Sequence, residues 1–273
     1  MTGIESVSEL ERVGYRAPLA LRCVDGVSGV EVNDALLATA WRRADPATMR
    51  TASRSPLSGL LGFGSLPGLW AAERTRSGPG QPLTWPPPTP TPFCARIVDT
   101  ARRYLAAVVA VDLPVGGPLV VPLSSAPGRP MPSGWAAVRG EVHRAAAPGS
   151  NGPLPWSVVR VDTGAAQYST VADSMGRFLL YLPYPEALPP LTGSIPHGGG
   201  IGTVSWPLAI SVRCQPGALQ QAPGAGPQDP PELGSIDTQA VAQIDDGSGP
   251  RPSVDQTLVF GTPLMVRLDV IPA

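Results

Sequence analysis

Short runs in which apolar and polar residues alternate recur along this chain and predict strands. Pro207–Cys214 shows the pattern most clearly, with Leu208, Ile210 and Val212 separated by small or polar residues. Residues 19–24 and Asp34–Trp41 repeat it near the amino terminus. Almost no window keeps apolar residues at helical spacing without meeting proline or glycine, both of which disfavour a helix interior. The pattern therefore predicts an all-β protein.

The stretch Gly134–Tyr184 contains the densest set of predicted strands. We expect strands at residues 136–143, 156–162, 168–171 and 177–182. Asp173 and Gly176 fall in a turn before the last of these strands: an aspartate can bond turn amides through its side chain, and glycine accepts positive φ. Phe178 begins the apolar face of the return strand. This turn is the most specific local signal in the chain.

The spacing of strands and breakers predicts two small β-sandwiches with long loops rich in proline and glycine. Gly 31 and Pro 35 of 273 residues punctuate segments that are otherwise apolar enough to form a core. We expect an amino-terminal arm at 1–17, a first sandwich at 18–123 with a long inserted loop at 42–92, a linker at 124–133, and a second sandwich at 134–273 with a loop at 215–252.

The two long loops are the predicted sites of function. Residues 42–92 show no sustained strand pattern, and residues 215–252 are mostly Gly, Pro, Gln and Asp, with little to bury. A loop this long within a compact domain is usually functional, disordered or bound to a partner. Trp70 and Trp85 are candidate partner contacts because exposed tryptophans often dominate interfaces; core packing or loop anchoring is the alternative.

Charge and hydropathy narrow the classes of partner. The formal net charge is −1, with Lys+Arg 20 against Asp+Glu 21, so nucleic acid is not expected as a partner. The most apolar window, Tyr104–Leu123, is broken by Asp112 and several Pro and Gly residues, and membrane insertion is not expected. The first residues lack the basic and apolar regions of a signal peptide, which predicts a cytoplasmic protein.

The sequence offers few residues for catalysis or metal binding. Cys23, Cys94 and Cys214 have the spacing of neither a disulfide framework nor a zinc site. His197 precedes three glycines, like the oxyanion loop of some esterases, but a G-x-S-x-G nucleophile elbow is absent, and a flexible glycine loop is the favoured interpretation of the run. We therefore predict a protein that is not an enzyme and has no catalytic, metal or cofactor-binding residues; a hydrolase using His197 is an alternative.

Part of the second predicted sandwich resembles the carboxypeptidase regulatory-like, or transthyretin-like, domain. The resemblance covers about a quarter of the chain and rests on V-x-G-x-V followed by T-x-x-D-x-x-G-x-F. The matching residues are Val138, Gly140, Val142, Thr170, Asp173, Gly176 and Phe178. It implies an immunoglobulin-like or transthyretin-like β-sandwich that serves as an accessory module without catalytic residues.

A second, architectural resemblance is to accessory proteins of phage-tail-like contractile injection systems, which implies a place in a bacterial particle assembled in the cytoplasm. Together these features predict a structural or assembly protein that docks onto other protein subunits and needs no cofactor. A β-sandwich that binds carbohydrate or another ligand is the first alternative, and the hydrolase is the second.

Overall fold

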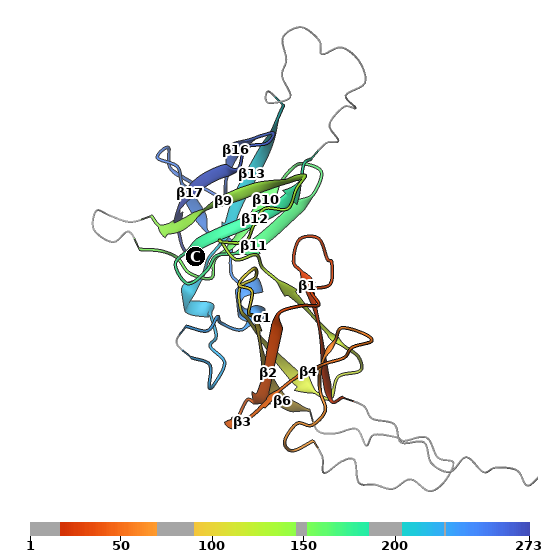
Figure 1. The fold of residues 1–273 in the computed structure, drawn as a ribbon. Helices are drawn as coiled ribbons and strands as arrows, with labels where there is room; N and C mark the ends of the chain where they lie inside the picture. Colours follow the sequence, from red (N-terminus) through yellow and green to blue (C-terminus); the bar gives the residue numbers. More distant parts are fainter. Residues whose placement is uncertain (1–16, 70–89, 146–151, 186–203, 227) are drawn as a thin grey trace, which may run out of the picture.

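The computed structural model describes residues 17–69, 90–145, 152–185, 204–226 and 228–273. Strands dominate these residues, and one short α-helix, α1 (Leu233–Asp237), accompanies them. The prediction of an all-β protein is confirmed. The strands form four sheets, which pair into two sandwiches placed one above the other in Figure 1. Within the described residues, no helix has the length and apolar character needed to span a bilayer.

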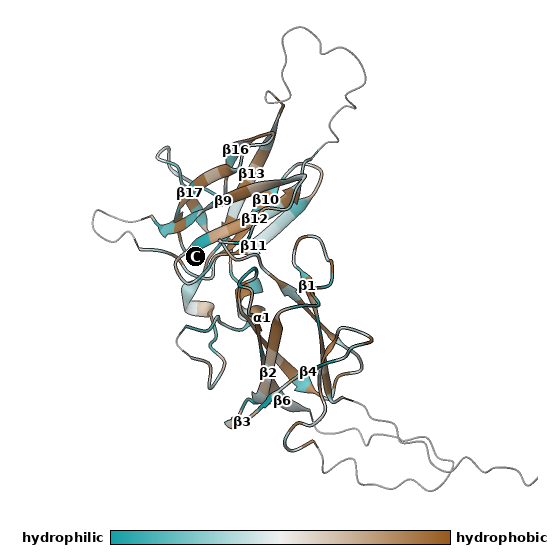
Figure 2. Cartoon of the chain, in the orientation of Figure 1, coloured by the Kyte–Doolittle hydropathy of each residue, from teal (hydrophilic) through white to brown (hydrophobic). Residues whose placement is uncertain are grey.

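The first sandwich packs a sheet of order β4-β5-β1-β8 against a sheet of order β3-β2-β6-β7. Its strands are β1 (Leu19–Asp25), β2 (Leu36–Arg42), β3 (Asp45–Thr51), β4 (Ser53–Arg54), β5 (Leu61–Phe63), β6 (Thr91–Asp99), β7 (Ala107–Leu113) and β8 (Leu119–Leu123). Alternate residues of β1, β2 and β6 face inward, and Leu21, Phe63, Phe93 and Ile97 fill the core. Figure 2 shows the apolar character of β2.

Residues 42–92 are not the uninterrupted loop that the sequence predicted. The structure places β3, β4, β5 and the start of β6 in this range. β3 lies at a sheet edge, and its residues are largely exposed. Because neither face of β3 is fully buried, its sequence lacks the apolar alternation by which strands were recognised.

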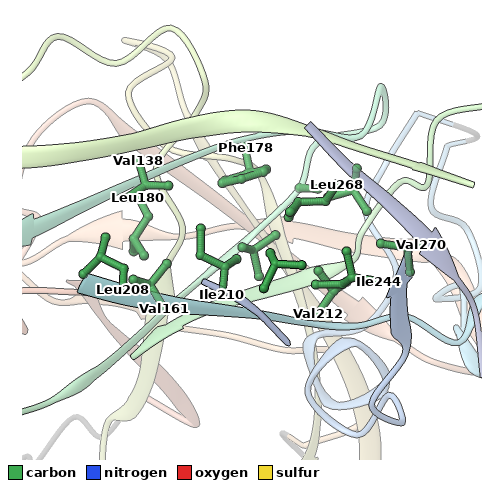
Figure 3. Packing of buried hydrophobic residues seen from close by; sticks show 14 of the residues in the cluster. Val138, Val161, Phe178, Leu180, Leu208, Ile210, Val212, Ile244, Leu268 and Val270 are labelled. Carbon is green, nitrogen blue, oxygen red and sulfur yellow. The ribbon is translucent and has the colours of Figure 1, made fainter. Parts of the chain in front are cut away.

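The second sandwich packs a sheet of order β11-β10-β13-β16 against one of order β12-β9-β17-β14-β15. Its strands are β9 (Trp135–Arg144), β10 (Val158–Asp162), β11 (Gln167–Val171), β12 (Arg177–Pro183), β13 (Ser205–Arg213), β14 (Gln243–Asp245), β15 (Pro250–Arg251), β16 (Ser253–Val259) and β17 (Leu264–Ile271). Figure 3 shows the core, where Phe178 and Leu180 of β12 face Leu208, Ile210 and Val212 of β13. The alternation read in Pro207–Cys214 therefore corresponds to β13.

Residues 215–252 also differ from the expectation of an exposed loop with little to bury. We call residues 215–241 the strap. It contains a 3-10 turn, η3 (Pro216–Ala218), and α1, and it buries Ala222, Glu232 and Ile236. The strap leaves the second sandwich after β13 and packs on the first, where Leu233 contacts the core. Its burial depends on a surface distant in sequence, so local composition did not predict it.

Candidate docking surfaces

The turn after β11 is held by a single carboxylate. Asp173 Oδ1 accepts hydrogen bonds from the amides of Met175, at 2.8 Å, and Arg177, at 2.9 Å, while Oδ2 accepts one from the Arg177 guanidinium at 2.8 Å. Gly176 has a φ of +74°, and a Cβ there would lie 2.6 Å from the carbonyl oxygen of Val142. Asp173 and Gly176 thus build a tight turn against β9.

The other residues of the sequence signature are also placed within the fold. The buried Thr170 hydroxyl donates to the Leu179 carbonyl at 3.0 Å and so joins β11 to β12. Phe178 lies in the core. At Gly140, a Cβ would come within 2.1 Å of the Val266 carbonyl oxygen, so glycine allows the close approach of β17 to β9. These side chains contact their own fold rather than an open surface.

The candidate partner contacts Trp70 and Trp85, and His197, lie outside the described residues. Of the described tryptophans, Trp206 is in the second core and Trp41 is fully buried on the outer face of β2. The other histidine, His143, has its Nε2 2.9 Å from Glu141 Oε2 on β9. Of the described residues in this set, Trp41 and Trp206 belong to different clusters.

Trp41 forms the centre of the contact between the strap and the first sandwich. Its indole Nε1 donates to the Pro223 carbonyl at 2.7 Å. Cys94, Val108 and Ala222 complete a small buried cluster around the ring. The contact joins residues that are 182 positions apart, which explains why the sequence analysis missed it. An outward-facing tryptophan within the alternation of β2 is the signal that could have indicated a covered outer face.

Two ion pairs flank this cluster. Arg43 Nη2 lies 2.8 Å from Glu232 Oε1, and Arg96 Nη2 lies 2.6 Å from Asp229 Oδ1. The Glu232 side chain is only 7% exposed, and its residue forms a bridge with Val108 of β7. The interaction of the Arg43 guanidinium with the Glu232 carboxylate raises the pKa of Arg43 above its usual value. Both acidic residues belong to the strap and both arginines to the first sandwich, so charge complementarity supports this placement.

A second connection between the sandwiches centres on Arg129 of the linker. Its guanidinium stacks over the Tyr104 ring, 4.4 Å from the centroid, and donates to Asp25 Oδ2 at 2.6 Å. The Tyr104 hydroxyl donates to the same carboxylate oxygen at 3.0 Å. Tyr181 of β12 donates to the Arg129 carbonyl at 2.5 Å. We call these four residues the linker cluster; it ties β1, the linker and β12 together.

Burial and neighbouring groups shift the pKa values of Asp25 and Tyr104 in the linker cluster. Burial raises the pKa of Asp25, but the amides of Ser28 and Val27 and the Arg129 guanidinium outweigh it, so the pKa lies below its usual value. Burial, followed by the neighbouring Asp25 charge, raises the pKa of Tyr104 to about 12. Asp25 is therefore an anion held by several donors, and its role in the cluster is structural.

A small apolar crevice lies where both sandwiches and the strap meet. Its lining includes Leu105 and Pro122 of the first sandwich, Trp156 of the second, and Leu233 and Ile236 of α1. Trp156 has a φ of +60°, and its carbonyl accepts a hydrogen bond from Gln239 Nε2 at 2.9 Å. The left-handed conformation and the bond from the strap fix this tryptophan at the junction.

The most exposed large apolar side chain among the described residues is Leu57, at 98%. It lies in the hairpin between β4 and β5, where Gly59 has a φ of +70°. The Arg54 guanidinium donates to the carbonyls of Asn33 and Gly59, so the base of the hairpin is anchored. Val30, in the loop between β1 and β2, is 65% exposed. The first sandwich thus presents an apolar side chain on an anchored turn.

No protein-family model and no curated protein matches the chain. Among solved structures, the chain is similar to "The Bacillus anthracis TIE protein", with 9% sequence identity and a TM-score of 0.25. The match covers 93% of this chain and 34% of the other protein, so this chain spans about a third of the length of that protein. A TM-score this low supports no conclusion about fold or function.

Proposed function

We propose that this chain is a non-enzymatic structural protein that docks onto other protein subunits of an assembly. The observation that carries the proposal is the double connection of the two sandwiches, through the strap and through the linker cluster. A body whose parts are already held together loses less conformational freedom on association than one with loose domains. A connected pair of sandwiches is therefore well suited to hold partner subunits at a defined spacing.

The structure also changes where docking is proposed. The sequence pointed to residues 215–252, but the strap within that segment buries its apolar and acidic side chains against the first sandwich. Residues 42–92 stay the better candidate, because Leu57 on its anchored hairpin lies within them. Trp70 and Trp85, in the same segment, stay predicted contacts. A phage-tail-like contractile particle is the type of assembly that the sequence resemblance suggests.

Purification of the tagged chain from its native host, followed by mass spectrometry of the co-purifying proteins, tests the proposal. We expect a stoichiometric protein partner, and recovery of that partner falling about tenfold with Leu57→Ser, since truncating an anchor residue at the centre of an interface costs about 2 kcal/mol or more and tenfold corresponds to about 1.4 kcal/mol. Met265→Ser is the matched control, because Met265 is 70% exposed on β17 of the other sandwich.

Two results would contradict the docking proposal. One is the absence of any stoichiometric protein partner under native conditions. The other is equal recovery of the partner with the wild-type chain, with Leu57→Ser and with a double Trp70→Ala, Trp85→Ala variant, which would place any interface outside residues 42–92.

A further inference from the structure

Among the described strands, β16 lies at the edge of its sheet with one side unpaired. It spans Ser253–Val259 and pairs on one side with β13 over its full length. No strand within the described residues pairs with its other side. β16 contains no proline, and its pairing with β13 runs without a register shift. An edge of this kind can pair with another strand, and proteins usually block such edges.

Four of the other seven sheet edges among the described residues are shortened or interrupted. β4 and β15 are two residues long. β3 carries Pro46, and its register with β2 shifts between Ala40 and Arg42. β8 carries Pro122, which has no amide hydrogen to donate.

The other three edges are joined to neighbouring parts of the protein. β7 forms a bridge between Val108 and Glu232 of the strap. β11 and β12 are joined by the bond from the Thr170 hydroxyl to the Leu179 carbonyl. Over Ser253–Val259, β16 carries no proline and no register shift.

The pairing with β13 determines which backbone groups face the open side. Phe260 donates its amide to the Val204 carbonyl at 2.9 Å, directly beyond the pair of Ser205 with Val259. Hydrogen-bonded pairs alternate along an antiparallel ladder. The even-numbered residues of β16 thus bond to β13, and the amides and carbonyls of Asp255 and Thr257 point to the open edge.

We propose that two copies of this chain associate through β16, antiparallel and centred on Gln256. In this register Asp255 of each copy lies opposite Thr257 of the other, and their outward-facing amides and carbonyls form hydrogen-bonded pairs. With the outer pairs of Ser253 and Val259, up to about eight main-chain bonds join the copies, two for each hydrogen-bonded pair. The sheet then continues from one second sandwich into the other, through a symmetric interface of the isologous kind.

The side chains of β16 are complementary to a second copy in this register. The Thr257 hydroxyl can donate to the Asp255 carboxylate opposite it. Val254 lies opposite Leu258, and both are buried residues of the core face. The two Gln256 side chains meet at the two-fold axis, where each amide offers a donor and an acceptor to the other.

Neighbouring registers are less favourable. Centring the pair on Asp255 places two carboxylates directly opposite each other, which is destabilising. Centring it on Thr257 shortens the paired segment and places Gln256 opposite Leu258. Self-pairing therefore selects one register and favours a second copy as the partner. This dimer extends beyond the proposed docking function, since it uses the second sandwich and does not involve the hairpin that carries Leu57.

Site-specific cross-linking tests the register. Residues at a non-hydrogen-bonded antiparallel pair have Cα atoms about 4.5 Å apart, within the range of a disulfide. We expect the full-length Gln256→Cys variant to form a covalent dimer on mild oxidation. Thr257→Cys is the matched control. Residue 257 is equally close to the edge, but it faces Asp255 of the second copy, and residue 257 of that copy lies diagonally, with its Cα about 7 Å or more away. The native cysteines are buried and contribute little to intermolecular cross-linking.

Sedimentation velocity tests the association without a cross-link. We expect the fraction of wild-type dimer to rise with protein concentration. Gln256→Glu should raise the dissociation constant of the dimer at least tenfold, because two like charges then face each other at the axis. Thr257→Pro removes an outward amide and should also raise the dissociation constant of the dimer. The circular dichroism spectrum of this variant should match that of the wild type.

Several outcomes would overturn the proposal. One is a wild-type monomer at all concentrations that also resists cross-linking through Gln256→Cys. Another is a dimer that Gln256→Glu leaves intact, or that cross-links equally through Gln256→Cys and Thr257→Cys, since it would use a different surface. Partner recovery from the host is measured separately, so failure of the dimer is distinguishable from failure of the docking proposal.

Discussion

At the scale of single residues, the side chains that first drew attention have structural roles. Asp173 satisfies the amides of its own turn, and Gly140 and Gly176 occupy positions where a Cβ would collide with a backbone carbonyl. The signature could be read from the sequence because every contact of Asp173 lies within four residues of it. A motif of this kind reports the geometry of a turn, and it carries no information about a ligand.

Asp173→Ala should lower the free energy of unfolding by about 1–3 kcal/mol, because two amides lose their acceptor where the carboxylate is largely buried. Urea denaturation followed by circular dichroism measures the change. Met175→Ala, in the same turn but with an exposed side chain, is the control and should leave stability within about 0.5 kcal/mol of the wild type. Equal effects of both substitutions would show that the carboxylate is not the stabilising group.

Asp25 predicts a pH dependence of stability. Its folded pKa is below the unfolded value of about 4, so its contribution is fully present above that pH and is lost as the pH falls through the folded pKa. We expect the unfolding free energy of the wild type to fall more steeply below about pH 4 than that of Asp25→Asn. Urea titrations at several pH values give both curves. If the unfolding free energies of the wild type and of Asp25→Asn fall in parallel below about pH 4, Asp25 does not contribute to the loss of stability in acid.

At the scale of elements, the strap is the largest departure from expectation. A segment rich in Gly, Pro and acidic residues has little apolar surface of its own, and sequence reasoning places such a segment in solvent. Here the missing partner is supplied by the outer face of β2, β6 and β7, where Trp41, Cys94 and Val108 are buried. Its acidic residues lie opposite Arg43 and Arg96.

Cys94 reports whether the strap stays in place. The thiol is buried beneath the strap contact, and burial raises its pKa, so the reactive thiolate is scarce. We expect Asp229→Asn combined with Glu232→Gln to raise the labelling rate of Cys94 by a maleimide about tenfold, by weakening both ion pairs.

Peptide mass spectrometry resolves the three thiols in the labelling experiment. Cys23 and Cys214 lie in the two cores and serve as internal controls, because their labelling should not change. A uniform rise at all three cysteines would indicate general unfolding, and no rise at Cys94 would show that the ion pairs do not hold the strap.

At the scale of the whole molecule, two sandwiches that could be recognised separately are joined into one structure. The linker at 124–133 was predicted as a connector, and Arg129 within it bonds to Asp25 while its carbonyl accepts from Tyr181. The linker lies near the middle of the sequence and the strap lies in its last third, so the two connections come from separate segments. They supply the connection on which the proposed docking function rests.

The sequence by itself determined the all-β class, the inward faces of strands such as β13, and the turn at Asp173, because these depend on side-chain alternation and on contacts within a few residues. Tertiary structure alone decided where the strap lies, how Arg129 is used and which sheet edge stays open. Each depends on pairing between distant segments, as between Trp41 and Pro223, and no local pattern records the partner that a residue will meet.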